Sequence, residues 1–198
     1  MTDLVLASSS PRRKELLKQL GLDFDIIPSN IKETLKGETP GEMVKNLAMD
    51  KAMSVLPRVD RGKIIIGADT IVYMDGCIMG KPKDEGDAFS MLRKLSGRIH
   101  EVYTGLAVVN TTNSAVLLDY ECTQVLMKDL TDKDIINYIK TGESNDKAGA
   151  YAIQGKGSLI VKSIKGCYYN IVGLPIGKLR DMLLNWDFDL LVMGRQYD

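Results

Sequence analysis

Apolar positions along this chain fall into two kinds of pattern, which alternate without a strict order. Short continuous runs, such as Leu4 to Ala7 and Lys63 to Ala68, are typical of buried strands. Helical spacing, as in Leu16, Leu17 and Leu20, predicts amphipathic helices. Because the runs and the helical patterns are mixed but do not alternate one for one, the sequence predicts an α/β protein with a mixed sheet and flanking helices.

Capping residues and glycines define the expected ends of these elements. Proline after a capping serine or threonine predicts helix starts at Ser10-Pro11 and Thr39-Pro40, and Asp75-Gly76 predicts a tight turn. The expected helices are Pro11 to Gly21, Pro40 to Leu56, Asp84 to Leu95, Leu130 to Lys140 and Leu174 to Asn185. The expected strands are Leu4 to Ala7, Phe24 to Pro28, Lys63 to Ala68 continued by Ile71 to Met74, Glu101 to Asn110, Ala115 to Leu126, and a hairpin of Ser158 to Ile164 with Tyr168 to Val172.

Composition narrows the class of protein. The chain has 198 residues, and its 26 basic side chains equal its 26 acidic ones, so a protein that binds nucleic acid through bulk positive charge is excluded. Three widely separated cysteines without a C-x-x-C spacing argue against a zinc site and fit a reducing cytoplasm. No apolar run approaches the roughly 20 residues that a membrane span needs. We therefore expect a cytoplasmic protein without a membrane anchor.

The first polar cluster, in LASSSPRR, follows the first expected strand. Ser8, Ser9 and Ser10 precede a helix start, and Arg12 and Arg13 lie in its first turn. Backbone N–H groups at a helix N-terminus bind anions, and arginines add forked donors that suit phosphate oxygens. The alternative is an ordinary helix cap followed by two solvated arginines.

Two further clusters carry charge near expected strand ends. In GADT, Asp69 follows a buried strand and precedes Thr70, and a carboxylate there is costly unless it is used or paired. It could serve as a metal ligand or as a base for water, or it could close a turn. In GKPKD, a glycine and a proline frame Lys81, which could contact phosphate or remain a surface lysine. Glu33 and Lys51 are charged positions that local sequence does not assign.

The fourth cluster, DKAGAYAIQGKG, surrounds Tyr151 and Gln154 with small residues. Glycines let the backbone approach a ligand, and a glutamine amide can pair with the edge of a base. The alternative is a tight loop between strands. The single histidine, His100, has no nucleophile motif nearby, which favours a structural role. Hydrolysis by this chain would therefore depend on carboxylates and a metal ion.

Taken together and in order, these segments resemble the Maf family of nucleotide pyrophosphatases. The matching motifs read LASSSPRR, GADT, GKP, LSGRIHEVYTG, DKAGAYAIQG and VGLP, and they extend from Leu6 to Pro175. The resemblance implies a single Maf-like domain over residues 1–198, with the fold of the inosine-triphosphate pyrophosphatases and two lobes around a cleft. It also implies hydrolysis of a nucleoside triphosphate to the monophosphate and pyrophosphate, with Mg²⁺ or Mn²⁺.

The resemblance also assigns site residues. Asp69 is the catalytic aspartate, and with Glu33 it is expected to hold the metal. Arg12, Thr70 and Gln154 are expected to shape substrate choice. The remaining polar site positions that match the family are Ser8, Arg13, Lys51 and Lys81.

Within the family, GADT and the IQG glutamine resemble the branch that hydrolyses dTTP and UTP, and modified pyrimidine nucleotides are further candidate substrates. The chain departs from that branch at Ala152, where glycine is usual, so the methyl group is expected to affect fine selectivity. The family's association with septum formation leaves a second hypothesis, a nucleotide-binding regulator of cell division without turnover. The resemblance further suggests a homodimer.

Overall fold

The computed structural model describes residues 3–193, which form a mixed α/β fold with a seven-stranded sheet in the order β2-β1-β3-β5-β6-β7, β4 pairing with β3. The pairing of β1 with β2 and β3 is parallel, and that of β3 with β4 and β6 with β7 is antiparallel. The strands are β1 (Leu4–Leu6), β2 (Phe24–Ile26), β3 (Ile64–Met74), β4 (Cys77–Met79), β5 (Ile99–Asn110), β6 (Val116–Met127) and β7 (Val161–Lys165). The helices are α1 (Pro11–Gln19), α2 (Pro40–Val55), α3 (Glu85–Leu95), α4 (Asp132–Ile139), α5 (Tyr168–Val172) and α6 (Ile176–Leu184), with 3-10 turns at η1 (Leu56–Arg58), η2 (Ala148–Ala150) and η3 (Gly155–Leu159). The predicted fold class is confirmed.

The chain divides into two compact units. Unit 1 comprises the residues up to Asp69, Thr104–Glu121 and the residues from Gly173 on, and unit 2 comprises Thr70–Tyr103 and Cys122–Val172. Strands β3, β5 and β6 each run from one unit into the other. The two units agree with the two lobes that the family resemblance implies, and the single domain over residues 1–198 stays a prediction.

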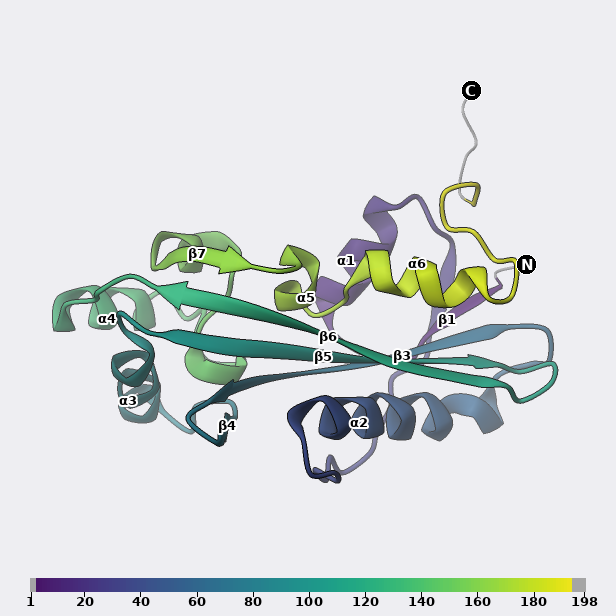
Figure 1. The fold of residues 1–198 in the computed structure, drawn as a ribbon, viewed down its shortest axis with the longest axis horizontal. Coiled ribbons are helices and arrows are strands. Elements are labelled where there is room, and N and C mark those ends of the chain that lie inside the picture. The colour runs from purple at the N-terminus through teal and green to yellow at the C-terminus, as the bar shows by residue number, and fades with distance from the viewer. Residues whose placement is uncertain (1–2, 194–198) are drawn as a thin grey trace. The chain divides into compact units, whose positions relative to one another are not determined.

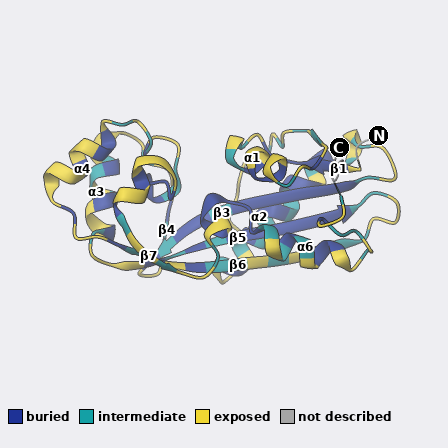
Figure 2. Ribbon diagram, turned by 90° about the horizontal axis from the view of Figure 1, so that it is seen from above, coloured by how far each residue is buried: buried dark blue, intermediate teal, exposed yellow. Residues whose placement is uncertain are grey.

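In unit 1, α2 covers one face of the strands, and α1 and α6 cover the opposite face (Figure 1). The core beneath α2 is built largely from small side chains on the helix and branched ones on the strands, among them Ala48, Ala52, Val5 and Ile65, none exposed to solvent. Figure 2 shows the same distribution, with β3 and β5 mostly buried and the outer faces of the helices exposed. Small helix residues allow a short distance between α2 and the sheet, and this distance positions the site described below.

Helix boundaries follow the capping signals closely. Thr39 caps α2 and Thr131 caps α4, each through a reciprocal capping box, with Glu42 and Asp134 respectively. Ser10 occupies the N-cap of α1, but its side chain makes no capping hydrogen bond within residues 3–193. Strand β4, which the sequence patterns did not indicate, follows the predicted turn at Asp75-Gly76 and pairs with β3.

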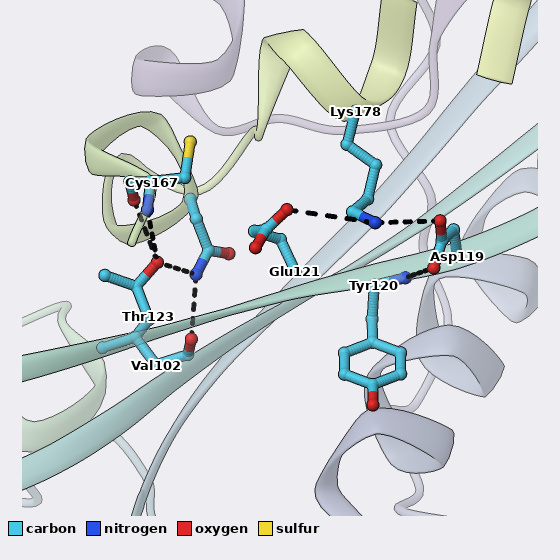
Figure 3. A network of polar contacts seen from close by, with 8 residues as sticks. Val102, Asp119, Tyr120, Glu121, Thr123, Cys167 and Lys178 are labelled. Atoms are coloured by element: carbon cyan, nitrogen blue, oxygen red, sulfur yellow. Dashed lines mark hydrogen bonds and ion pairs between the residues drawn. The ribbon is translucent and has the colours of Figure 1, made fainter. Parts of the chain in front are cut away.

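The predicted C-terminal hairpin is wrong in its second half. Strand β7 is present, but Tyr168–Val172 forms helix α5. Gly166, with φ of +130°, ends the strand, and the Asn170 side chain donates to the Val102 carbonyl (2.9 Å) and to the Thr123 hydroxyl (2.9 Å) (Figure 3). Aromatic and β-branched residues favour strands by propensity, but these buried hydrogen bonds need a turn that brings Asn170 inward.

Helix α6 is tied to the sheet of unit 1 by charge. Lys178 lies 2.9 Å from the Asp119 carboxylate and 3.9 Å from that of Glu121, both on β6 (Figure 3). The neighbouring carboxylates raise the pKa of Lys178, while its partial burial acts in the opposite direction and is the largest single contribution. This contact anchors the helix that follows the VGLP segment.

Candidate active site

A buried lysine contacts two carboxylates in unit 1. The Lys51 ammonium on α2 pairs with the Asp69 carboxylate on β3, and it lies 2.6 Å from the Glu33 carboxylate in the loop before α2. The side chains of Lys51 and Asp69 are only 10% and 9% exposed, whereas that of Glu33 is 58% exposed. One ammonium shared by two carboxylates leaves a formal charge of −1 at a point that opens to solvent through Glu33.

Glycines in the strands explain why α2 reaches Asp69. A Cβ at Gly67 would collide with the Ala48 carbonyl oxygen on α2, and one at Gly105 would collide with the Val44 carbonyl. Backbone atoms of the helix therefore lie directly against both strands, which only glycine allows. Gly67 and Asp69 are two residues apart in β3 and thus share a face, so the close approach brings Lys51 onto the carboxylate.

The serine and arginine cluster lies in the same unit. Arg13 is buried, its Nε donates to the Gly173 carbonyl (2.7 Å), and its Nη1 donates to the Ser8 hydroxyl (3.2 Å). The Ser8 hydroxyl also accepts from the Ser10 backbone N–H (3.2 Å). Ser8 and Arg13 thus fix the turn between β1 and α1, and Arg12, in the first turn of α1, is half-buried.

Electrostatics connects Arg13 with the carboxylates. Burial lowers the pKa of the Arg13 guanidinium, and the negative charges of Asp69 and Glu33 oppose that shift, Asp69 more strongly. A buried arginine remains charged because its ordinary pKa is far above neutrality. Arg13 of the SPRR motif and Asp69 of the GADT motif therefore belong to one charged region of unit 1.

Three predicted site residues belong to unit 2. Thr70 is half-buried on β3, and Lys81 and Gln154 are exposed. The segments that carry Lys81 and Gln154 are joined, because the Gly149 N–H donates to the Gly80 carbonyl (3.0 Å). The structure thus brings the GKP and DKAGAYAIQG segments side by side within this unit.

The segment that carries Gln154 is fixed by residues that sequence reasoning left unassigned or structural. The Tyr151 hydroxyl lies 2.7 Å from His100 Nε2, and the Ala152 N–H donates to the Tyr138 hydroxyl (3.0 Å). The Glu143 carboxylate accepts from two backbone N–H groups beyond Gln154. Tyr138 and Glu143 were missed because an isolated Tyr in a helical pattern, or an isolated Glu after a helix, gives no local signal of a long-range contact.

The structural role predicted for His100 agrees with its surroundings. Its side chain is buried, desolvation lowers its pKa to about 4, and the ring is therefore neutral near pH 7. Nδ1 has no hydrogen-bond partner among residues 3–193, so only one of the two ring nitrogens is satisfied.

The donor set for a metal in unit 1 is small. Within the described residues there is no group of three or more His, Cys, Asp or Glu side chains that could hold a metal ion, so Glu33 and Asp69 are the carboxylates available at the lysine. Two carboxylate oxygens are a poor cage for an isolated ion. They fit Mg²⁺ when it retains water and phosphate ligands, which is its usual environment in phosphoryl-transfer sites.

No helix in residues 3–193 is both long and apolar enough to cross a bilayer.

The model for the family described as Maf-like protein matches residues 3–186. Among similar proteins, the "dTTP/UTP pyrophosphatase" of Thermoanaerobacter sp. (strain X514) is 52% identical over 96% of this chain and 99% of its own length. The protein of the same name from Caldicellulosiruptor saccharolyticus is 50% identical over 96% of this chain and 98% of its own length. That of Clostridium perfringens is 46% identical over 95% of this chain and 99% of its own length. Among solved structures, a HAM1 protein from Coxiella burnetii matches with a TM-score of 0.44 and 18% identity, over 64% of this chain and 73% of that one.

Proposed function

The chain belongs to the Maf family, and from this premise we propose that it hydrolyses dTTP and UTP to the nucleoside monophosphate and pyrophosphate. The observation that carries the proposal is the identity of 46–52% with proteins named dTTP/UTP pyrophosphatase, over nearly the full length of each. These names favour an enzyme over a nucleotide-binding regulator of septum formation.

Unit 1 supplies the charged groups that such a reaction needs. A triphosphate is a polyanion, and its transition state spreads charge over the phosphoryl oxygens. Arg12 and the first turn of α1 bind the phosphate tail, and the turn is held in place by Ser8 and Arg13. The Asp69 carboxylate accepts the proton of the attacking water, and Lys51, in contact with it, holds it in place.

The proposed cofactor is Mg²⁺ or Mn²⁺, held by Glu33 and Asp69. When bound, the ion would neutralise phosphate charge and lower the pKa of a water molecule. The support for this assignment is the oxygen donor set of the two carboxylates, one of which, Glu33, is exposed to solvent.

Recognition of the base is proposed for Gln154 and Thr70, and Lys81 adds positive charge for phosphate. These roles come from the family motifs, and the exposure of Lys81 and Gln154 is compatible with them. The Gln154 amide offers one donor and one acceptor group, the combination that reads the edge of a pyrimidine. We also propose a homodimer, which light scattering after gel filtration would test, and a cytoplasmic location, which the sparse cysteines favour.

A nucleotide panel tests the function. The purified chain is incubated with dTTP, UTP, dCTP, dATP and dGTP, each with Mg²⁺, Mn²⁺ or EDTA, and the products are separated by ion-exchange chromatography. We expect monophosphate and pyrophosphate from dTTP and UTP, with little turnover of the purines and none in EDTA. Absence of turnover with every nucleotide, combined with thermal stabilisation by dTTP, would favour the regulator instead.

A further inference from the structure

The segment around Gln154 has an unusual pattern of burial. The four residues before it, Ala150 to Ile153, are all buried, with exposed fractions between 0% and 8%, whereas Gln154 itself is exposed. Gly149, Ala150 and Gly155 all have positive φ, so the backbone reverses direction on both sides of the segment. A short stretch that is buried, sharply bent and yet exposes one polar side chain is held in a defined shape.

Two tyrosines fix the segment on the N-terminal side of Gln154. The Tyr151 ring packs edge-on against His100, with ring centroids 5.3 Å apart, and its hydroxyl contacts Nε2. The Tyr138 hydroxyl on α4 accepts from the Ala152 N–H. Both contacts are buried, where a hydrogen bond is costly to lose.

On the C-terminal side a single carboxylate holds the backbone. Glu143 Oε1 accepts from the Lys156 N–H (3.0 Å) and Oε2 from the Gly157 N–H (3.1 Å). A Cβ at Gly155 would lie 2.6 Å from Glu143 Oε1, so the carboxylate lies directly against this glycine. Glu143 thus binds both backbone donors at the start of η3 from outside the turn.

This arrangement spares the glutamine. Gln154 is the N-cap residue of η3, a position whose side chain commonly accepts from the first backbone N–H groups. Within residues 3–193 its side chain makes no such capping bond, and Glu143 supplies the acceptors instead. The Gln154 amide is therefore not used in holding its own turn.

We propose that Glu143 is a positioning residue that fixes the orientation of Gln154 and so sets the choice between pyrimidine bases. The inference rests on the proposed function, in which Gln154 reads the base. Uracil and thymine carry a carbonyl where cytosine carries an amino group. A Gln154 amide held with its NH₂ group toward this position therefore favours uracil and thymine over cytosine. A turn that loses its carboxylate anchor allows the amide to rotate and serve both bases.

The test compares kcat/KM for dTTP with kcat/KM for dCTP in Glu143→Ala and Glu143→Gln. We expect the ratio to fall about 3- to 10-fold in Glu143→Ala, the effect of about one hydrogen bond, and by less in Glu143→Gln, which retains one acceptor oxygen. A ratio of two substrates is independent of the fraction of folded enzyme, so mere instability does not change it. An unchanged ratio in both variants would overturn the proposal.

A double-mutant cycle with Gln154→Ala gives the decisive readout. If Glu143 acts through Gln154, Glu143→Ala has no further effect on the ratio once Gln154 is removed, so the two changes are not additive. Additive effects would show that Glu143 acts by another route. Asp75→Asn is the control, because this carboxylate also lies in unit 2 and accepts hydrogen bonds from Arg98 on the exposed surface. Its ratio should equal that of the parent chain.

The outcomes separate the two levels of inference. If the parent chain releases no pyrophosphate from any nucleotide, the proposed function fails before Glu143 is tested. If the parent chain prefers dTTP to dCTP but Glu143→Ala keeps the same preference, the function stands and the positioning role fails.

Discussion

The two units hold their predicted site residues by different physical means. In unit 1 the groups are charged and partly buried, and Lys51 pairs with Asp69 and Glu33 while Arg13 experiences the charge of both carboxylates. In unit 2 the exposed Gln154 is positioned by a neutral buried pair, His100 and Tyr151, and by backbone hydrogen bonds.

The difference reflects the two tasks proposed for these residues. Binding and hydrolysing a polyanion requires charge, and charges inside a protein are tolerated only when each compensates another. Distinguishing bases requires a fixed direction for one amide, which hydrogen bonds to the backbone of its segment provide without adding positive charge that would attract the phosphate. Unit 1 is therefore expected to be sensitive to single charge changes, and unit 2 to changes in hydrogen bonding.

The largest effect is expected for Asp69→Asn. Removing the carboxylate that takes the proton should lower kcat for dTTP by about 10²- to 10⁴-fold, the usual contribution of a general base. Asp50→Asn is the control, since Asp50 pairs with Lys36 on the exposed surface of the same unit. Steady-state pyrophosphate release measures both variants, and a near-normal kcat in Asp69→Asn would remove Asp69 from the mechanism.

Lys51→Met tests the charge balance of unit 1. Removing one partner of a buried pair costs about 3–5 kcal/mol, so the free energy of unfolding in urea should fall by that order. Mg²⁺ should stabilise Lys51→Met more than the parent chain, because the ion replaces the missing positive charge between Glu33 and Asp69. Lys36→Met, at an exposed pair, should cost less than about 1 kcal/mol. If Mg²⁺ stabilised Lys51→Met and the parent chain equally, the assignment of the metal to Glu33 and Asp69 would be contradicted.

Acid titration of stability tests the neutral pair in unit 2. The pKa of His100 is about 4 in the folded chain, compared with an ordinary value of 6.5. Between these values the unfolded chain binds the proton and the folded one does not, so stability is complete above pH 6.5 and falls as the pH approaches 4. The total contribution is about 3 kcal/mol.

The matched variant for this titration is His100→Asn. Urea unfolding from pH 7.5 to pH 4.5 should show a steeper loss of stability in the parent chain than in the variant. Parallel curves would mean that His100 titrates normally in the folded protein.

The smallest effect is expected for Arg12→Ala. Loss of a charged donor to the phosphate tail should raise KM for dTTP about tenfold, while the half-buried side chain contributes less than about 0.5 kcal/mol to stability. Lys14→Ala, at an exposed position of the same helix, provides the comparison. A KM that changes equally in the two variants would show general electrostatic attraction rather than a specific contact.

Local sequence was sufficient for most elements. The capping boxes at Thr39 and Thr131 and the apolar run before Asp69 correctly predicted α2, α4 and β3, because each signal acts within a few residues. The helix at Tyr168–Val172 was mispredicted as a strand, because Asn170 finds its partners on β5 and β6, far away in sequence.

For the site, the amino-acid sequence by itself determined the residue types and their order, and hence the family, since six short motifs in one order are recognisable without coordinates. The sequence by itself did not determine which charged side chains are in contact with one another. The contact of Lys51 with Asp69 depends on α2 lying directly against Gly67 and Gly105, and the support of Gln154 by Glu143 depends on a turn folding back on the end of α4. Ion pairs and backbone hydrogen bonds act over a few ångströms in space, so only the tertiary structure decided them.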